Sequence, residues 1–228
     1  MSKQQRLNWL GAFAALIFTT IILASFLFTS SPAEAKSQTA TSTVTFDSKA
    51  NAVKQIESQA PELKDRVLRL ALKAYDKARA QGLDDQQLLS VIDYSDPSTQ
   101  KRLWVLDMQH DTVLYHTLVA HGKASGANYA HYFSDRHSSD ASSLGVFLTA
   151  KTYHDHHGLA MRLKGLDPGF NDQVYSRNVV MHSAWYVSQD FINKHGRLGR
   201  SFGCPALSKQ VEPQVVNTIK NGSLLFVY

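Results

Sequence analysis

The only cysteine of this 228-residue chain, Cys204, lies in the segment Gly199-Arg-Ser-Phe-Gly-Cys-Pro-Ala206. A thiol attacks a carbonyl carbon as its thiolate, so a nucleophilic cysteine needs a base or a cation nearby. Histidine is the usual base because the pKa of its ring lies near neutrality. His182 follows the apolar run Asn178-Val-Val-Met181 and is expected at the end of a strand, where a sheet rim holds its side chain rigidly. Cys204 and His182 are therefore the candidate nucleophile and base.

The neighbours of Cys204 suit nucleophilic chemistry. Gly203 lets the backbone turn tightly and lets a substrate carbonyl approach closely. Pro205 has no N–H, so a backbone oxyanion hole must draw on residues at or before the cysteine, with Gly203 and Cys204 the natural donors. The Ser201 hydroxyl is a further donor or loop support, and Arg200 offers positive charge to a substrate carboxylate.

Other histidines compete for these roles. His121 also ends an expected strand and is a rival base, although His182 is favoured. His154, His156 and His157 invite a metal site, but no acidic residue or second cysteine at a recognisable spacing completes one. We interpret them as a solvated hairpin tip, and we predict neither a metal nor another cofactor.

The N-terminus predicts export. Lys3 and Arg6 precede an apolar run over residues 10–28, which is followed by Ala33-Glu-Ala35. This is the pattern of a signal peptide over residues 1–35, cleaved after Ala35, with a retained membrane anchor as the alternative. We expect the rest of the chain in the bacterial periplasm or cell envelope, touching the membrane only through an uncleaved leader.

Export bears on the interpretation of Cys204. Oxidising compartments favour paired cysteines, and this chain has no second one. The count alone supports a reactive thiol and a buried, inert side chain equally. The residues around the cysteine favour the reactive thiol. The net charge of +5 is spread along the chain without an arginine-rich tract, so no nucleic-acid partner is predicted.

Two segments of different composition follow the predicted signal peptide. Residues 36–49 have the Ser-, Thr- and Ala-rich composition of a linker, and residues 50–95 are predicted to form a small helical cap. Its first helix has Pro61 in the first turn, ends at Gly82, and carries the stripe Leu63, Val67, Leu70, Ala74 and Ala78. A shorter helix starts at Asp84 or Asp85 and carries Leu88, Leu89 and Ile92.

Residues 96–228 are predicted to form a mostly β catalytic domain, so the fold class is α+β with β dominant. Two segments flank the turn His110-Asp111 as a hairpin, 103–108 and 112–119. Further short strands are expected at 145–149, 160–164, 178–181 and 224–228, and a helix at 211–220. We interpret residues 195–196 as loop.

Three segments of the chain together resemble the YkuD-type L,D-transpeptidases. They are Val179-Val-Met-His182, Ser201-Phe-Gly-Cys204 and the terminal Asn221-Gly-Ser-Leu-Leu-Phe-Val-Tyr228. Upstream, Ser143-Leu-Gly-Val-Phe147 is similar to the T-P-x-G-x-F segment of that family. The resemblance covers about residues 101–228, and it is closest to a divergent branch of murein L,D-transpeptidase catalytic domain proteins. It implies a β-sandwich or barrel.

The resemblance also implies a reaction. Cys204 would attack the stem-peptide carbonyl that precedes the terminal D-Ala, with His182 supplying a proton to the leaving amine. An amine of a second peptidoglycan stem peptide would resolve the thioester and form a 3-3 cross-link. The resemblance puts His121 at a turn near the cleft, where it would contact substrate, and Ser183 beside the base as loop support.

This chain departs from the commoner branch at two positions and in one spacing. Ser183 stands where that branch has a glycine after the histidine, and Ala206 where it has an arginine two residues after the cysteine. The segment between His182 and Cys204 is also several residues longer. Either Arg200 replaces the missing arginine, or the substrate specificity differs.

Three alternative functions are open. Water in place of the amine would make the protein an L,D-carboxypeptidase, and loss of activity would leave a wall-binding module. A sortase-like ligase also has histidine before cysteine, but it needs an arginine on a later strand, and none follows Cys204.

Overall fold

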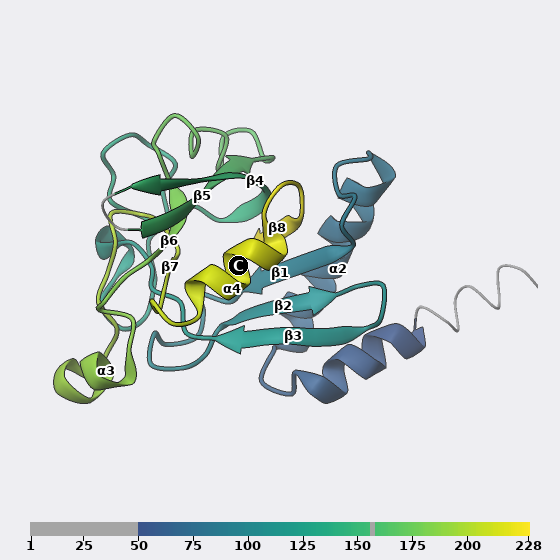
Figure 1. Ribbon diagram of the computed structural model, residues 1–228, viewed down its shortest axis with the longest axis horizontal. Helices are drawn as coiled ribbons and strands as arrows, with labels where there is room; N and C mark the ends of the chain where they lie inside the picture. Colours follow the sequence, from purple (N-terminus) through teal and green to yellow (C-terminus); the bar gives the residue numbers. More distant parts are fainter. Residues whose placement is uncertain (1–49, 156–157) are drawn as a thin grey trace, which may run out of the picture. The chain divides into compact units, whose positions relative to one another are not determined.

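The computed structural model describes residues 50–155 and 158–228, so the expected signal peptide and linker lie outside the described residues. The described strands are β1 (Leu88–Ile92), β2 (Leu103–Asp107), β3 (Thr112–Thr117), β4 (Gly145–Asp155), β5 (Gly158–Gly165), β6 (Val180–Ser183), β7 (Ala206–Leu207) and β8 (Leu224–Val227). They form one sheet in the order β3-β2-β1-β8-β4-β5-β6-β7 (Figure 1).

The two edges of this sheet meet. Ala120, three residues beyond the end of β3, exchanges backbone hydrogen bonds with Ala206 of β7, at 2.9 and 3.3 Å. A second bridge joins Gly122 to Ser201. The sheet therefore curls into a nearly closed barrel, and the predicted mostly β fold is confirmed.

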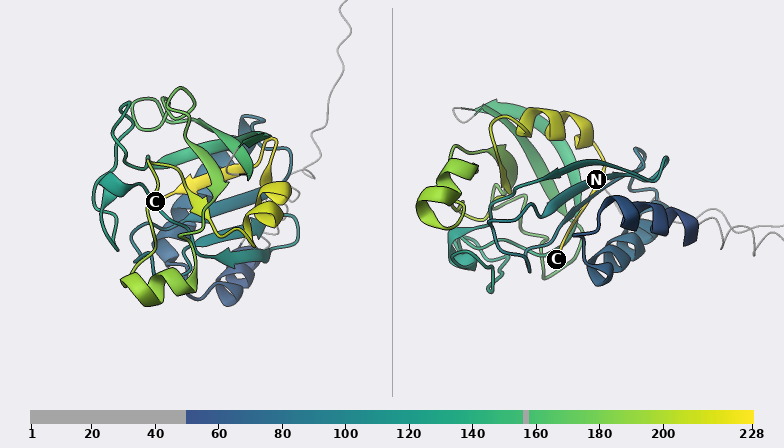
Figure 2. Two further views of the ribbon diagram at one scale, coloured as in Figure 1. Left: turned by 60° about the vertical axis from the view of Figure 1, so that its left-hand side comes forward. Right: turned by 90° about the horizontal axis from the view of Figure 1, so that it is seen from below.

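Helices pack on both faces of the strands. In β2, Leu103 and Val105 contact one apolar cluster, while Trp104 and Leu106 contact another, as the two-residue period of a strand requires. The first cluster includes helix α4 (Glu212–Ile219) and the second includes helix α2 (Asp65–Ala80). Figure 2 shows these two helices on opposite sides of the sheet.

The N-terminal helical region differs from the prediction in three ways. Residues 50–59 are helical, and Pro61 lies in the turn before α2 rather than in a first helical turn. The buried stripe of α2 is Val67, Leu68, Ala71, Tyr75 and Ala78, so the predicted stripe was rotated by about one residue and Leu70 is exposed. The predicted second helix is wrong, because its residues form β1.

Strand β1 was misassigned for a physical reason. It pairs antiparallel with β2 and parallel with β8, and four of its five residues are fully buried. A strand covered on both sides is apolar throughout, so it lacks the alternation that separates a strand from a buried helix.

Most of the later elements follow the prediction. The hairpin of β2 and β3, the strands β5, β6 and β8, and helix α4 are confirmed with small shifts of their ends, and the strand predicted at 145–149 is confirmed as β4 but extends six residues further, to Asp155. The sequence interpretation missed β7, the one-turn 3₁₀ helix η1 (Lys123–Ser125) and helix α3 (Gln189–His195), whose last residue was predicted to be loop. Within residues 50–155 and 158–228, no helix has the length and apolarity that crossing a membrane would require.

Candidate active site

Strand register brings His182 and Cys204 together. Strands β6 and β7 run parallel, with His182 beside Ala206. Cys204 lies two residues before Ala206 and is therefore beside Val180, whose N–H lies 3.4 Å from the cysteine Sγ. Because side chains two residues apart share one face of a strand, the ring and the thiol open into the same space. Both line one pocket of about 390 Å³.

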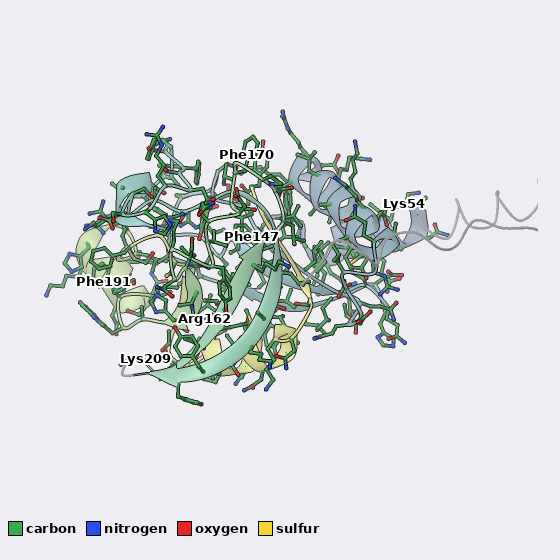
Figure 3. The ribbon with its side chains drawn as sticks, turned by 90° about the horizontal axis from the view of Figure 1, so that it is seen from above. Lys54, Phe147, Arg162, Phe170, Phe191 and Lys209 are labelled. Atoms are coloured by element: carbon green, nitrogen blue, oxygen red, sulfur yellow. The ribbon has the colours of Figure 1, made fainter. Side chains whose placement is uncertain are left out.

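Four of the predicted site residues line this pocket: Cys204, His182, Arg200 and Ser201. The other lining residues are Tyr153, Asn178, Val180, Trp185, Tyr186 and Phe202. Trp185 and Phe202 are about 70% exposed, so the mouth of the pocket carries two aromatic rings in solvent. Trp185 also packs edge-on against Phe191 of α3, which Figure 3 labels. The long segment between His182 and Cys204 thus builds one wall of the site.

The hydrogen bond of His182 fixes its tautomer. Its Nδ1 lies 2.9 Å from the carbonyl oxygen of Ser183. A carbonyl only accepts, so Nδ1 carries the proton and, in the neutral ring, Nε2 holds the lone pair. A base needs that lone pair to take a proton. Ser183 therefore supports the histidine through its main chain.

The side chain of Cys204 is half-buried at the wall of the pocket. Burial raises its pKa, while the N–H of Val180 and the charge of Arg177 act in the opposite direction. A raised pKa means that the resting side chain is a thiol rather than a thiolate. Nucleophilic attack from this site therefore requires a base to take the proton, and His182 is the histidine of the pocket.

Ser201 organises the loop that carries the thiol. Its Oγ donates to the carbonyl of Cys204 at 2.6 Å and accepts from the N–H of Gly203 at 3.1 Å. Its own N–H donates to the carbonyl of His121. Gly203 has φ +122°, and a Cβ there would lie 2.8 Å from the carbonyl oxygen of Ala141. Only glycine fits at this position.

This loop changes the expected set of oxyanion donors. The N–H of Gly203 is already bonded to Ser201, whereas that of Cys204 has no hydrogen-bond partner in the described part of the chain. Tyr186 offers a second donor that sequence reasoning missed. Burial and the nearby Cys204 raise the pKa of Tyr186 to about 12, so the hydroxyl stays protonated beside the thiol.

His121 does not reach the pocket. Its side chain is 0% exposed, and its Nδ1 lies 2.7 Å from Nη2 of Arg102. Arginine only donates, so Nδ1 accepts and the ring is neutral. Burial, followed by the charge of Arg102, lowers the pKa of His121 to about 4. The structure thus places this histidine underneath the Cys204 loop, away from where substrate contact was expected.

Two arginines approach the site from different sides. Arg200 lines the pocket, and its Nη1 donates to the carbonyl of Gly126 at 2.9 Å. Arg177, which sequence reasoning missed, is buried behind Gly203. No spacing or flanking pattern marks Arg177 in the sequence, because its partners come from a loop more than 30 residues away.

Of the three clustered histidines, only His154 belongs to the described residues. His154 is exposed near the end of β4, and residues 156–157 lie outside the described residues. Within the ranges 50–155 and 158–228, no three His, Cys, Asp or Glu side chains gather as a metal site would require. The absence of a metal remains a prediction.

Comparison with known proteins places this site in a family context. Residues 59–228 match the family described as L,D-transpeptidase catalytic domain. No curated protein matches the chain. Solved structures that resemble it include an L,D-transpeptidase from Mycobacterium smegmatis, with 17% identity, 62% of this chain and 58% of that chain covered, and a TM-score of 0.38.

Two further solved structures resemble the chain to a similar degree. An L,D-transpeptidase from Stackebrandtia nassauensis has 14% identity, 63% and 56% of the two chains covered, and a TM-score of 0.39. L,D-transpeptidase 3 from Mycobacterium tuberculosis has 13% identity, 62% and 61% covered, and a TM-score of 0.39. The aligned region spans less than two thirds of each of these solved chains.

Proposed function

The chain belongs to the L,D-transpeptidase catalytic domain family, and we propose from this premise that it is an exported peptidoglycan L,D-transpeptidase with Cys204 as its nucleophile. The observation that carries the proposal is the shared pocket of Cys204 and His182, in which Nδ1 of the imidazole donates to the carbonyl of Ser183. A half-buried thiol beside such a ring has the composition of an acyl-transfer site.

The first half of the reaction forms a thioester. His182 takes the proton of the Cys204 thiol, and Sγ attacks the carbonyl carbon that precedes the terminal D-Ala of a stem tetrapeptide. The N–H of Cys204 and the hydroxyl of Tyr186 stabilise the oxyanion. When the intermediate collapses, the C–N bond breaks, and the D-Ala amine leaves with the proton held by His182.

The second half decides between two products. In transpeptidation, the amine of a second stem peptide attacks the thioester carbonyl, its proton passes to His182, and the thiol leaves, which forms a 3-3 cross-link. If water attacks instead, the product is a shortened stem peptide and the protein is an L,D-carboxypeptidase. The exposed rings of Trp185 and Phe202 at the pocket mouth offer an apolar surface on which the acceptor stem peptide could pack.

Substrate recognition is assigned to the pocket wall. Arg200 lies at the pocket with a permanent positive charge, which suits a carboxylate of the stem peptide. The net charge of +5 suits an anionic envelope polymer in the same way. The proposed location in the periplasm or cell envelope rests on the leader pattern of residues 1–35, and the proposed partners are peptidoglycan stem peptides.

The test is mass spectrometry of defined tetrapeptide muropeptides incubated with the purified full-length chain. We expect D-Ala release together with 3-3 dimers, and neither product with Cys204→Ala. Trimmed monomers without dimers would assign the carboxypeptidase activity instead. Wild-type protein that binds muropeptides but releases no D-Ala would make the chain a wall-binding module and overturn the enzyme proposal.

A further inference from the structure

Arg177 is a buried arginine three residues before Val180, the first residue of β6, and its side chain is 3% exposed. Its guanidinium donates to four groups of the loop formed by residues 134–143. These are the carbonyls of Ser134 at 2.9 Å and Ala141 at 2.8 Å, and the hydroxyls of Ser143 at 2.7 Å and Ser139 at 3.1 Å. Its ion-pair partner, Asp135, lies on the same loop at 3.3 Å.

The same guanidinium packs against the loop that carries the nucleophile. A Cβ built on Gly203 would lie 3.2 Å from Nη2 of Arg177 and 2.8 Å from the carbonyl oxygen of Ala141. The residue before Cys204 therefore rests directly on the arginine and on a carbonyl that the arginine holds. The backbone that follows Arg177 also approaches the thiol, with the N–H of Val180 lying 3.4 Å from Sγ.

Stability alone is a poor reason for this arrangement. Burying a charged pair costs desolvation energy that its attraction often fails to offset, and apolar residues of similar volume are frequently as stable. Nε of Arg177 is buried without a hydrogen-bond partner among the described residues, which adds to that cost. Because a buried arginine with an unpaired Nε costs stability, its presence at this position points to a role in the adjoining site.

We propose that Arg177 is the positioning residue of the nucleophile: it fixes Gly203 against the 134–143 loop and holds a permanent positive charge behind Cys204. This role differs from that of Arg200, which lines the open pocket. The part of the proposal that concerns turnover rests on the proposed function, whereas the part that concerns thiol reactivity does not.

Several titratable or charged groups face Cys204 and share in its reactivity. Among the described residues these groups are Tyr94, Tyr153, Arg177, His182, Tyr186 and Arg200. At neutral pH the two arginines are the permanent cations of this set. Of these two, Arg177 is the one whose charge lowers the pKa of the Cys204 thiol.

The experiment measures the rate of Cys204 alkylation by iodoacetamide against pH in the full-length chain, which has no other thiol. Arg177→Gln removes the charge, so its profile moves to higher pH and alkylation at pH 7 slows several-fold, by up to about tenfold. Asp135→Asn removes the negative charge that pairs with Arg177 and leaves the arginine's positive charge uncompensated, so the alkylation profile of this variant moves to lower pH. Arg136→Gln removes an exposed charge from the same loop and changes the rate less than about twofold.

The opposite signs exclude a merely structural role, because loosening the loop would shift both variants the same way. Shifts in one direction, or a profile of Arg177→Gln that matches the wild type, would overturn the proposal. If Arg177→Gln does not fold, Asp135→Asn and the charge-conserving Arg177→Lys decide it. The lysine variant should keep the wild-type pH profile while turnover falls, because lysine cannot span the four partners.

Failure of the proposed function would look different. A wild-type chain that makes no muropeptide product, but whose thiol responds to Arg177→Gln and Asp135→Asn as described, removes the enzyme assignment and leaves the role of Arg177 standing. Conversely, a chain with full transpeptidase activity, in which neither substitution changes the pH profile of Cys204 alkylation, keeps the enzyme assignment and removes the role of Arg177.

Discussion

His182 donates a hydrogen bond from Nδ1 to the carbonyl oxygen of its own neighbour, Ser183, at 2.9 Å. Catalytic histidines are commonly oriented by an acidic side chain, whereas here a main-chain carbonyl holds the ring. Replacement of a side chain does not remove a backbone acceptor, so the carbonyl that orients His182 stays in place whatever side chain residue 183 carries.

Replacing the base tests this relationship. His182→Ala removes the proton acceptor from a site in which the raised pKa keeps Cys204 as a thiol, so turnover of tetrapeptide muropeptides should fall by about 10²- to 10⁴-fold. Ser183→Ala keeps the carbonyl and should retain at least about half of the activity. Initial rates of D-Ala release measure both. A large loss in Ser183→Ala would mean that its hydroxyl takes part.

The Ser201 hydroxyl should matter for stability as well as activity. Ser201→Ala removes the two hydrogen bonds that link it to Gly203 and Cys204, and leaves buried groups without partners. We expect unfolding to become easier by about 1–3 kcal/mol, and D-Ala release to slow at least tenfold as the loop loosens. Denaturant unfolding and initial rates are the measurements. Ser58→Ala, which removes an exposed helical hydroxyl, is the control, and an equal loss in both variants would refute a special role for Ser201.

The β2–β3 hairpin was the most predictable part of the fold. Residues 103–107 and 112–117 are runs rich in apolar, β-branched and aromatic residues on either side of a short polar turn, and the hairpin follows from those local signals. No tight turn joins β1 to a partner strand, and its short, mostly apolar run has no period that would separate a strand from a buried helix. Helix α3 is only seven residues long, and its capping signals, Ser188 and Gly196, are too common in loops to be decisive alone.

The candidate site was predictable where chemistry is local to one segment. Cys204, Gly203 and Ser201 interact within four residues, so the sequence carries their relationship. Arg177 and His121 depend on partners that only the folded chain brings near. The contacts of Arg177 span more than 30 residues, and the burial of His121 follows from the bridge between the barrel edges. For neither residue do the neighbouring positions in the sequence show a pattern that predicts these contacts.

The absence of a side chain at residue 203 is also testable. Gly203→Ala places a Cβ against the carbonyl oxygen of Ala141 and the guanidinium of Arg177, in a backbone conformation with φ +122°. We expect D-Ala release to drop by more than about a hundredfold, since a displacement of about 1 Å at a nucleophile has that effect. Gly82→Ala is the matched control, because it shares a positive φ but has nothing within 4 Å of the new Cβ. If Gly203→Ala keeps the activity of the control, the packing argument fails.

Glu212 predicts a pH-dependent stability that is independent of catalysis. It is buried at the first turn of α4, and its Oε1 has no hydrogen-bond partner in the described part of the chain. Burial raises its pKa from 4.5 to about 7. A carboxyl whose folded pKa lies above its unfolded value binds more protons in the folded state, so its ionisation penalises folding as pH rises from about 4.5 and the penalty is complete above about 7.

Glu212→Gln removes that penalty and keeps the shape of the side chain. The variant should be more stable than the wild type at pH 8, by on the order of 1–3 kcal/mol, and close to it at pH 4.5, where the carboxyl is neutral in the folded state. Thermal unfolding at the two pH values measures the difference, with the exposed Glu62→Gln as the control. A gain of the same size at both pH values would show that improved hydrogen bonding, rather than removal of a buried charge, stabilises the variant.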